Sequence, residues 1–169
     1  FEAHLRYLRD NNFKVIPLDQ MIDSLRSGQS LPDKSVVITF DDGYSSIFDE
    51  AFPLLQSYGY PFTLFLSTEP IDAGLSNYIT WDQVRQMSTA GVIIANHMVD
   101  HPYMLEARDN ESARQRLARL EEDLLKAEQR IEAQTGQSHR YLAYPYGEYE
   151  PAIKSLLEEL DFVGLAQNS

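Results

Sequence analysis

Short apolar runs alternate with amphipathic stretches along the whole chain. Six runs rich in apolar or β-branched residues predict strands, at residues 13–18, 36–40, 61–67, 92–95, 141–145 and 162–166. Between them, apolar positions recur every three or four residues, which predicts helices over 1–10, 19–28, 47–59, 81–91, 111–135 and 151–160. The run 36–40 lacks alternation, as in a parallel strand that is covered on both faces. Regular β–α alternation predicts a mostly parallel sheet, open or closed into a barrel, in one domain.

Several predicted helices begin or end at residues suited to capping. Thr80 and Gln83 have the spacing of a capping box, and Gly136 follows the longest predicted helix. That helix carries one apolar stripe among charged residues, so we expect it to pack on the sheet with its polar side in solvent. A coiled coil that binds a partner is the alternative interpretation.

The composition narrows the possible partners. With 26 acidic and 14 basic residues, the formal net charge is −12, which argues against nucleic acid or an anionic membrane as a partner. No apolar stretch approaches the roughly 20 residues of a transmembrane helix. The chain has no cysteine, so a disulfide framework and thiolate ligands are excluded. A neutral or cationic substrate fits this charge better.

Polar and aromatic residues suited to chemistry follow three of the predicted strands. Asp41 and Asp42 come after the second strand, His97 and His101 after the fourth, and a Tyr-Pro-Tyr-Gly turn at 144–147 after the fifth. The carboxyl ends of parallel strands meet at one edge of a sheet or barrel. We therefore expect these three groups of residues to lie close together.

Two imidazoles and one carboxylate suit zinc or a similar first-row divalent ion. His97 and His101 could face the same way on a helix or converge in a tight loop, and Pro102 favours the loop. Three protein ligands leave positions open for water and substrate. The carboxylate that is not a ligand can then take a proton from a water that the cation has acidified.

Each pattern also has a purely structural explanation. An Asp-Asp-Gly sequence after a strand is often a polar turn and helix N-cap, and two histidines four residues apart are a weak signal alone. Their joint occurrence behind different strands favours a functional site. We interpret His4 and His139 as surface residues and Asp100 as a loop-shaping residue, with support of a metal ligand as the alternative for Asp100. We interpret Tyr44, Trp81 and Tyr149 as packing residues, with the lining of a sugar subsite as the alternative for one of them.

The segments "VVITFDDGY", "NHMVDHPYM" and "AYPYGEY", in this order, resemble the first three motifs of the polysaccharide deacetylases, the carbohydrate esterase family 4 or NodB homology domain. The resemblance implies a distorted (β/α)7 barrel. It implies Asp41 as the general base and Asp42, His97 and His101 as ligands of one divalent ion, most often zinc, with cobalt, nickel or another first-row ion as alternatives. It also implies the backbone N–H of Tyr146 as the oxyanion donor, in a substrate-binding turn with Tyr144 and Pro145.

The implied reaction removes N-acetyl groups from a polysaccharide that contains N-acetylglucosamine, of the poly-N-acetylglucosamine, peptidoglycan or chitin type. The "AYPYG" sequence is similar to that of bacterial members acting on exported poly-N-acetylglucosamine, which implies a periplasmic, cell-envelope or secreted protein. Many relatives have Arg where this chain has Ala143. The later family motifs, which include a histidine general acid, are missing. We therefore expect residues 1–169 to be one truncated deacetylase domain, with about six strands, that binds an ion but deacetylates poorly.

Three alternatives remain. A glycoside hydrolase would use the aspartate pair, although adjacent carboxylates reach opposite sides of a sugar, about 5 Å apart, only with difficulty. A non-catalytic carbohydrate-binding relative would keep the metal site without the chemistry. A hydrolase of small cyclic amides is the third. The sequence leaves the oligomeric state open.

Overall fold

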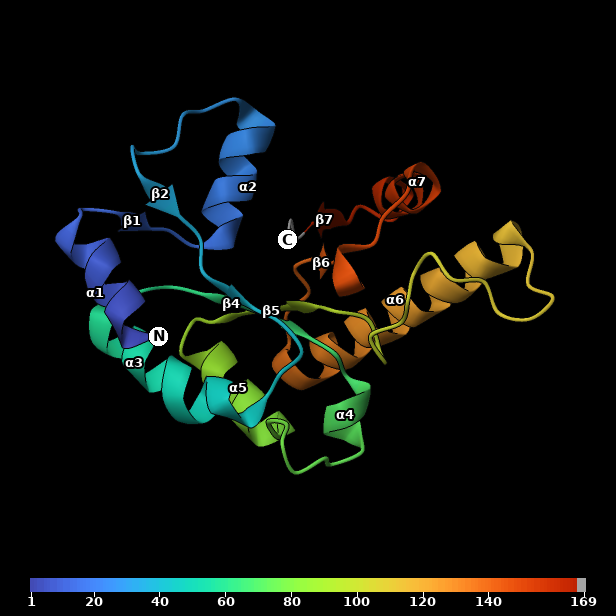
Figure 1. The fold of residues 1–169 in the computed structure, drawn as a ribbon, viewed down its shortest axis with the longest axis horizontal. Helices are drawn as coiled ribbons and strands as arrows, with labels where there is room; N and C mark the ends of the chain where they lie inside the picture. The colour runs from blue at the N-terminus through green and yellow to red at the C-terminus, as the bar shows by residue number, and fades with distance from the viewer. Residues whose placement is uncertain (167–169) are drawn as a thin grey trace.

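Strands and helices alternate through residues 1–166, which are the residues that the computed structural model describes (Figure 1). The strands are β1 (Lys14–Val15), β2 (Ser35–Val36), β3 (Thr39–Phe40), β4 (Thr63–Leu66), β5 (Ile93–Asn96), β6 (Tyr141–Ala143) and β7 (Val163–Leu165). The helices are α1 (Glu2–Asp10), α2 (Leu18–Ser27), α3 (Phe52–Tyr58), α4 (Glu69–Asp72), α5 (Trp81–Thr89), α6 (Ala113–Thr135) and α7 (Pro151–Glu159). A π-helical segment, η1 (Ile47–Ala51), leads into α3, and a 3₁₀ turn, η2 (Pro145–Gly147), follows β6.

The main sheet has five parallel strands in the order β3-β4-β5-β6-β7. Spatial order equals chain order, as in a barrel built from successive βα units. The sheet is curled into a half-barrel, and within the described residues β3 and β7 each pair with one neighbour, so the ring is open. The prediction of an incomplete parallel barrel of this type is confirmed. A separate two-stranded parallel sheet, β1-β2, lies beside it.

The prediction of a single doubly buried strand over 36–40 is wrong. Val36 pairs with Val15 in the small sheet, whereas Thr39 pairs with Thr63 in the main sheet. The chain crosses between the two sheets in the intervening two residues. Because β3 is an edge strand, Thr39 is exposed and the run is only partly covered. The strands buried on both faces are β4, β5 and β6.

Helices cover both faces of β4 and β5. On one face, Leu64, Leu66 and Ile94 belong to a core cluster to which α1, α3 and α5 contribute Leu5, Leu55 and Val84. On the opposite face, the alternate strand residues Phe65, Ile93 and Ala95 pack with Leu18 and Ile22 of α2. This alternation follows from the two-residue period of a strand.

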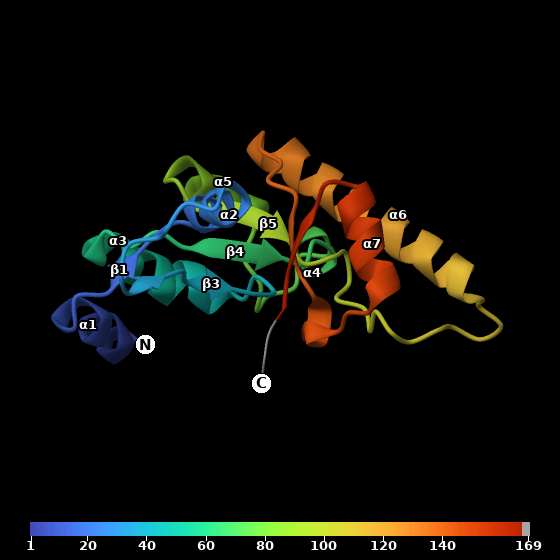
Figure 2. The ribbon, with the colours of Figure 1, turned by 90° about the horizontal axis from the view of Figure 1, so that it is seen from above.

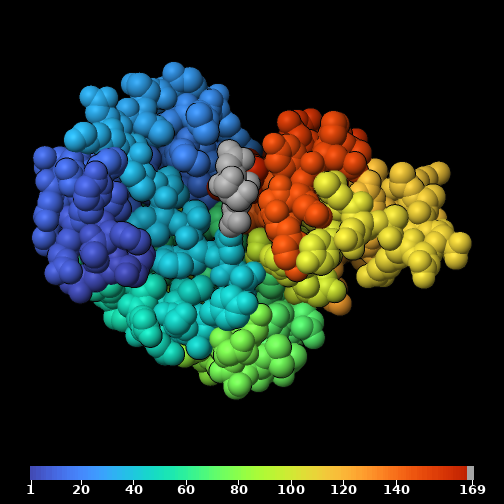
Figure 3. Space-filling view, in the orientation of Figure 1, coloured from blue at the N-terminus to red at the C-terminus, as the bar shows by residue number. Residues whose placement is uncertain are grey.

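The longest helix, α6, packs its apolar stripe into the protein, as predicted. Leu120, Leu124, Ala127 and Ile131 are buried, and Figure 2 shows α6 crossing the end of the sheet beside α7. Its first turns and the preceding segment project from the body of the molecule (Figure 3). Across the described chain, no helix combines the length and apolar character that a membrane crossing requires.

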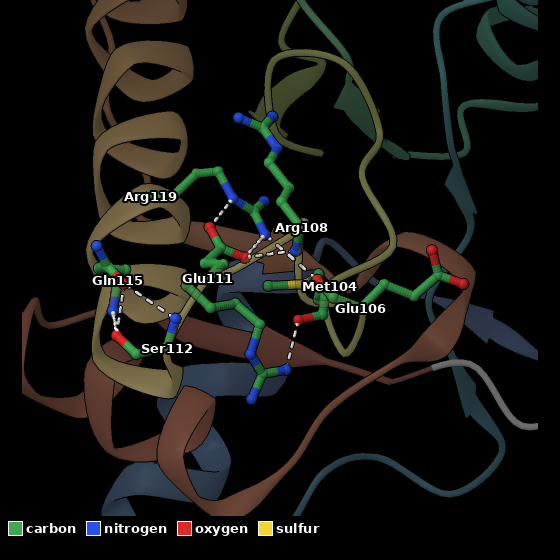
Figure 4. Close-up of polar contacts among 8 residues, drawn as sticks. Met104, Glu106, Arg108, Glu111, Ser112, Gln115 and Arg119 are labelled. Carbon is green, nitrogen blue, oxygen red and sulfur yellow. Dashed lines mark hydrogen bonds and ion pairs between the residues drawn. The ribbon is translucent and has the colours of Figure 1, made fainter.

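Capping fixes the starts of two helices. The capping box predicted at Thr80 and Gln83 is present, and a second box at Ser112 and Gln115 begins α6 (Figure 4). Gly136 ends α6 in the left-handed conformation, as expected of a C-terminal glycine. The short helix α4 was not predicted, because four residues are too few for a periodic pattern.

Candidate metal and catalytic site

The loops that follow β3 and β5 bring three of the predicted site residues together. Ligand atoms of Asp42, His97 and His101 all lie within 4.8 Å of one another. Asp42 follows the edge strand β3, and both histidines lie in a loop without helical structure after β5. All three come from the carboxyl ends of parallel strands, where active sites of such folds are built.

The separations within this group fit one ion. Oδ1 of Asp42 lies 3.5 Å from Nε2 of His97 and 3.6 Å from Nε2 of His101. Ligand atoms about 2.0–2.1 Å from a tetrahedral ion lie about 3.4 Å from one another. The two distances from Asp42 therefore match those between ligands of a shared ion, and all three ligand atoms lie within 4.8 Å of one another. The set of two nitrogens and one oxygen suits zinc.

Burial and one hydrogen bond fix the orientation of the His97 ring. This side chain is only 2% exposed, and its Nδ1 lies 2.8 Å from the carbonyl oxygen of Ala143. Because a carbonyl oxygen only accepts, Nδ1 donates to it and Nε2 faces Asp42. A neutral His97 presents a lone pair on Nε2 for a metal, whereas a protonated His97 donates from Nε2 to the Asp42 carboxylate. In many metal sites, the ring nitrogen of a histidine that does not bind the metal makes such a hydrogen bond, which orients the ring. The backbone carbonyl of Ala143 therefore holds the His97 ring in place.

The loop that carries His101 is held from two sides. The N–H of Met98 donates to Oδ1 of Asn96 at 2.8 Å, at the end of β5. The N–H of Val99 donates to Oδ1 of Asp123, also at 2.8 Å, from α6. Asp123 therefore supports the loop in the way that we expected of Asp100, which is exposed at the rim of the site.

Electrostatics favours the forms that bind metal. A hydrogen bond from His97 lowers the pKa of Asp42, and this outweighs the opposing effect of burial. Burial, and secondly the charge of His97, lowers the pKa of His101. An ionised carboxylate and a neutral imidazole are the protonation states in which these side chains act as ligands.

Asp41 lies beside the three ligands. It is half-buried, and its charge acts on His101 in the direction that raises the histidine pKa. The next residues turn sharply, with φ of 72° at Asp42 and 95° at Gly43. A Cβ on Gly43 would lie 2.6 Å from Cδ1 of Leu66, so the turn is packed directly against the core.

The third predicted segment contributes one side chain to the site. Tyr146 is 54% exposed, and its ring centroid lies 4.4 Å from that of His101. Tyr144 and Pro145 are buried instead, and the Tyr144 hydroxyl lies against Gly164. The structure therefore brings Tyr146 to the ligands and places the other two side chains beneath the turn.

Four residues around the site that are not glycine adopt left-handed backbone conformations. They are Asp42 (φ 72°), Met98 (67°), His101 (55°) and Tyr146 (56°). Such conformations cost about 1–2 kcal/mol each for residues with a Cβ. Strained residues of this kind cluster at functional sites.

A pocket of about 360 Å³ opens over the ligands. It is lined by Asp42, Tyr44, Ser67, Pro70, Tyr78, Asp100, His101 and Tyr146. We interpreted Tyr44 from the sequence as a packing residue and did not single out Tyr78. The position of Tyr44 directly after Asp41-Asp42-Gly43 was an available signal. No local pattern indicated Tyr78, because it reaches the pocket through pairing with a distant segment.

The other candidates interpreted as structural lie away from the ligands. His4 is exposed, and His139 is half-buried with its ring 3.1 Å from the side-chain oxygen of Gln137. Trp81 donates its ring N–H to Asp72 at 2.7 Å. Tyr149 packs on Tyr144 with a 5.3 Å separation between ring centroids.

Comparisons with known proteins agree with this arrangement. The family described as Polysaccharide deacetylase matches residues 28–165. A poly-beta-1,6-N-acetyl-D-glucosamine N-deacetylase of Staphylococcus epidermidis is 28% identical over 153 residues, which cover 87% of this chain and 52% of that protein. The chain thus spans about half the length of this relative.

Solved structures show the same fold. The deacetylase domain of BpsB from Bordetella bronchiseptica aligns with a TM-score of 0.87 and 25% identity, covering 98% of this chain and 76% of that one. IcaB from Ammonifex degensii aligns with a TM-score of 0.86 and 26% identity, covering 98% and 73%. With the family match extending over most of its length, the chain belongs to the polysaccharide deacetylase family.

Proposed function

We propose that this chain is a metal-dependent hydrolase that removes N-acetyl groups from a polysaccharide containing N-acetylglucosamine. The observation that carries the proposal is the group formed by Asp42, His97 and His101, with ion-binding separations at the open rim of the half-barrel. Poly-β-1,6-linked N-acetylglucosamine is the first substrate to test, because several relatives are named for that activity. Peptidoglycan and chitin types are the alternatives.

Each site residue has a distinct role in this proposal. Asp42, His97 and His101 hold one divalent first-row ion, zinc in the first instance. When bound, such an ion polarises the acetyl carbonyl and lowers the pKa of a water. The Asp41 carboxylate accepts a proton from the attacking water. The backbone N–H of Tyr146 donates to the carbonyl oxygen as negative charge develops on it. The C–N bond breaks as the amine nitrogen takes up a proton, from Asp41 or from water, and acetate and a free amine leave.

Tyr144 and Pro145 act on the substrate indirectly. Both are buried, so we assign them to holding the turn that presents Tyr146. A polysaccharide substrate of this class also implies a place of action in the periplasm, in the cell envelope or outside the cell.

The arrangement favours this reaction over a glycoside hydrolase. Asp42 is paired with two histidines, which leaves only Asp41 of the aspartate pair for acid–base chemistry across a glycosidic bond. A non-catalytic carbohydrate-binding relative would share the same metal group. Only the proton-transfer role of Asp41 separates that alternative from a deacetylase.

The test combines metal content with acetate release. Elemental analysis should find about one zinc-like ion per chain, lost in Asp42→Ala and His97→Ala. With N-acetylglucosamine oligomers, Asp41→Asn should lower the rate of acetate release about 10²–10⁴-fold relative to the unaltered chain while retaining the ion. A chain that takes up no zinc would contradict the metal site. A zinc-loaded chain that binds oligomers and releases no acetate even in long incubations, which would detect the slow turnover expected of this chain, would favour the non-catalytic alternative. Activity that survives chelation would refute metal dependence.

A further inference from the structure

Two pairs of stacked tyrosines flank the metal-ligand group. Tyr103 and Tyr146 stack with ring centroids 4.0 Å apart, next to His101. Tyr44 and Tyr78 stack at 4.9 Å, and both line the pocket over the ligands. The proposed chemistry uses only the backbone of Tyr146. The pair of Tyr44 and Tyr78, which we call the tyrosine ledge, has no role in it.

Backbone pairing holds the tyrosine ledge in place. Tyr44 and Tyr78 form an antiparallel bridge. The N–H of Ser45 donates to the carbonyl of Asn77, and the N–H of Ile79 donates to the carbonyl of Gly43, both at 2.9 Å. A surface whose rings are fixed before a ligand arrives loses little conformational entropy on binding.

The ledge presents aromatic surface to the pocket. Tyr44 is 43% exposed, and Tyr78, which stacks against it, is half-buried. The face of an aromatic ring is negatively charged and attracts the C–H bonds on the face of a pyranose. A hydrogen bond with Tyr44, together with burial, raises the pKa of Tyr78 to about 12, which reflects how closely the two side chains interact.

We propose that the tyrosine ledge is a sugar-stacking subsite for the residue next to the one whose acetyl group is removed. The proposal rests on the proposed function, because the ligand group marks where the reacting acetyl group lies. Asp42 lies two residues before Tyr44, so a sugar stacked on the ledge would be close to the reacting one. The site would therefore prefer oligosaccharides to a single sugar.

Binding by the zinc-loaded chain tests this subsite. The probes are the β-1,6-linked tetramer of N-acetylglucosamine and the monosaccharide, with Kd measured by calorimetry. Tyr44→Ala should weaken tetramer binding about tenfold and leave monosaccharide binding unchanged. Tyr44→Phe should stay close to the unaltered chain, because it keeps the ring. Tyr7→Ala is the matched control, since Tyr7 is 61% exposed on α1.

The outcomes separate the ledge from the proposed function. Tyr44→Leu keeps apolar volume without a ring, and it replaces Tyr44→Ala if that variant loses zinc or melts early. An unchanged tetramer Kd in the ring-free variant, with zinc content and acetate release retained, would overturn the ledge alone. Tetramer binding that weakens as predicted in a chain without acetate release would support the ledge and contradict the deacetylase. A chain that binds no tetramer would overturn the ledge directly.

Discussion

At the scale of the residue, Gly43 couples the aspartate turn to the core. Its φ is +95°, and a Cβ there would meet Leu66 at 2.6 Å. Gly43→Ala adds left-handed strain and overpacks the contact with β4, so we expect the free energy of unfolding to fall by about 2–4 kcal/mol. Urea denaturation measures this loss.

Gly28→Ala is the control for that substitution. Gly28 has a similar φ of +71°, but a Cβ at this position would have no atom within 4 Å. Because only the left-handed backbone strain applies at Gly28, we expect the free energy of unfolding to fall by about 1 kcal/mol. Equal losses at the two glycines would show that contact with Leu66 does not matter.

The site residues differ in how far the sequence could reveal them. Asp42, His97 and His101 could be singled out because they lie within six residues of the end of an apolar run, and strand ends converge in a parallel sheet. Tyr78 follows no strand, and it reaches the pocket only through pairing of 77–79 with 43–45. Long-range pairing of this kind leaves no local periodicity, so sequence reasoning could not find Tyr78.

At the scale of the element, α6 supports the histidine loop through Asp123. Its carboxylate accepts the Val99 N–H, two residues before His101. Asp123→Ala removes that anchor, and we expect zinc affinity to fall about tenfold. Asp123→Asn keeps an acceptor oxygen and should stay close to the unaltered chain. Competition with a zinc chelator measures both; equal affinities in the two variants would assign the support to the bond between Met98 and Asn96.

The start of α6 should contribute to the pH dependence of stability. Arg119 donates to both carboxylate oxygens of Glu111, at 2.7 and 2.8 Å (Figure 4). The hydrogen bond from Arg119, together with that from the Arg108 N–H, lowers the pKa of Glu111 to about 2. A lowered pKa in the folded state stabilises above the ordinary value of 4.5, and this contribution is lost as the pH falls towards 2.

The test compares denaturation across that pH range. In Glu111→Gln, the free energy of unfolding should fall less steeply between pH 4.5 and about pH 2 than in the unaltered chain. Glu122→Gln, at an exposed position on α6, serves as the control. Parallel curves for all three proteins would mean that Glu111 contributes nothing to acid stability.

Element boundaries were predictable where local chemistry sets them. Gly136 and the box of Thr80 with Gln83 mark helix ends by themselves, because capping involves only neighbouring residues. The division of 36–40 between two sheets was not predictable. Val36 and Thr39 both have strand propensity, and only the positions of distant partner strands decide which sheet each joins.

At the scale of the whole molecule, a bound ion should stabilise the fold. The ligands come from two loops that are distant in sequence, so binding requires the folded chain. Zinc at about 100 times its Kd should add about 2.7 kcal/mol to the free energy of unfolding, raising Tm by about 5–10 °C. Scanning calorimetry with zinc and with a chelator measures the shift. His97→Ala should show none, and an equal shift there would indicate binding elsewhere.

The left-handed residues around the ligands have a consequence for protein engineering. In the loops that follow the strands, the backbone is left-handed at four residues: Asp42, Met98, His101 and Tyr146. If only two histidines and an aspartate were placed in another barrel, the left-handed backbone conformations would be missing. The three side chains would then point away from one another. A transfer of the metal site to another protein therefore has to include the whole loops with their left-handed residues, together with the strands that precede them.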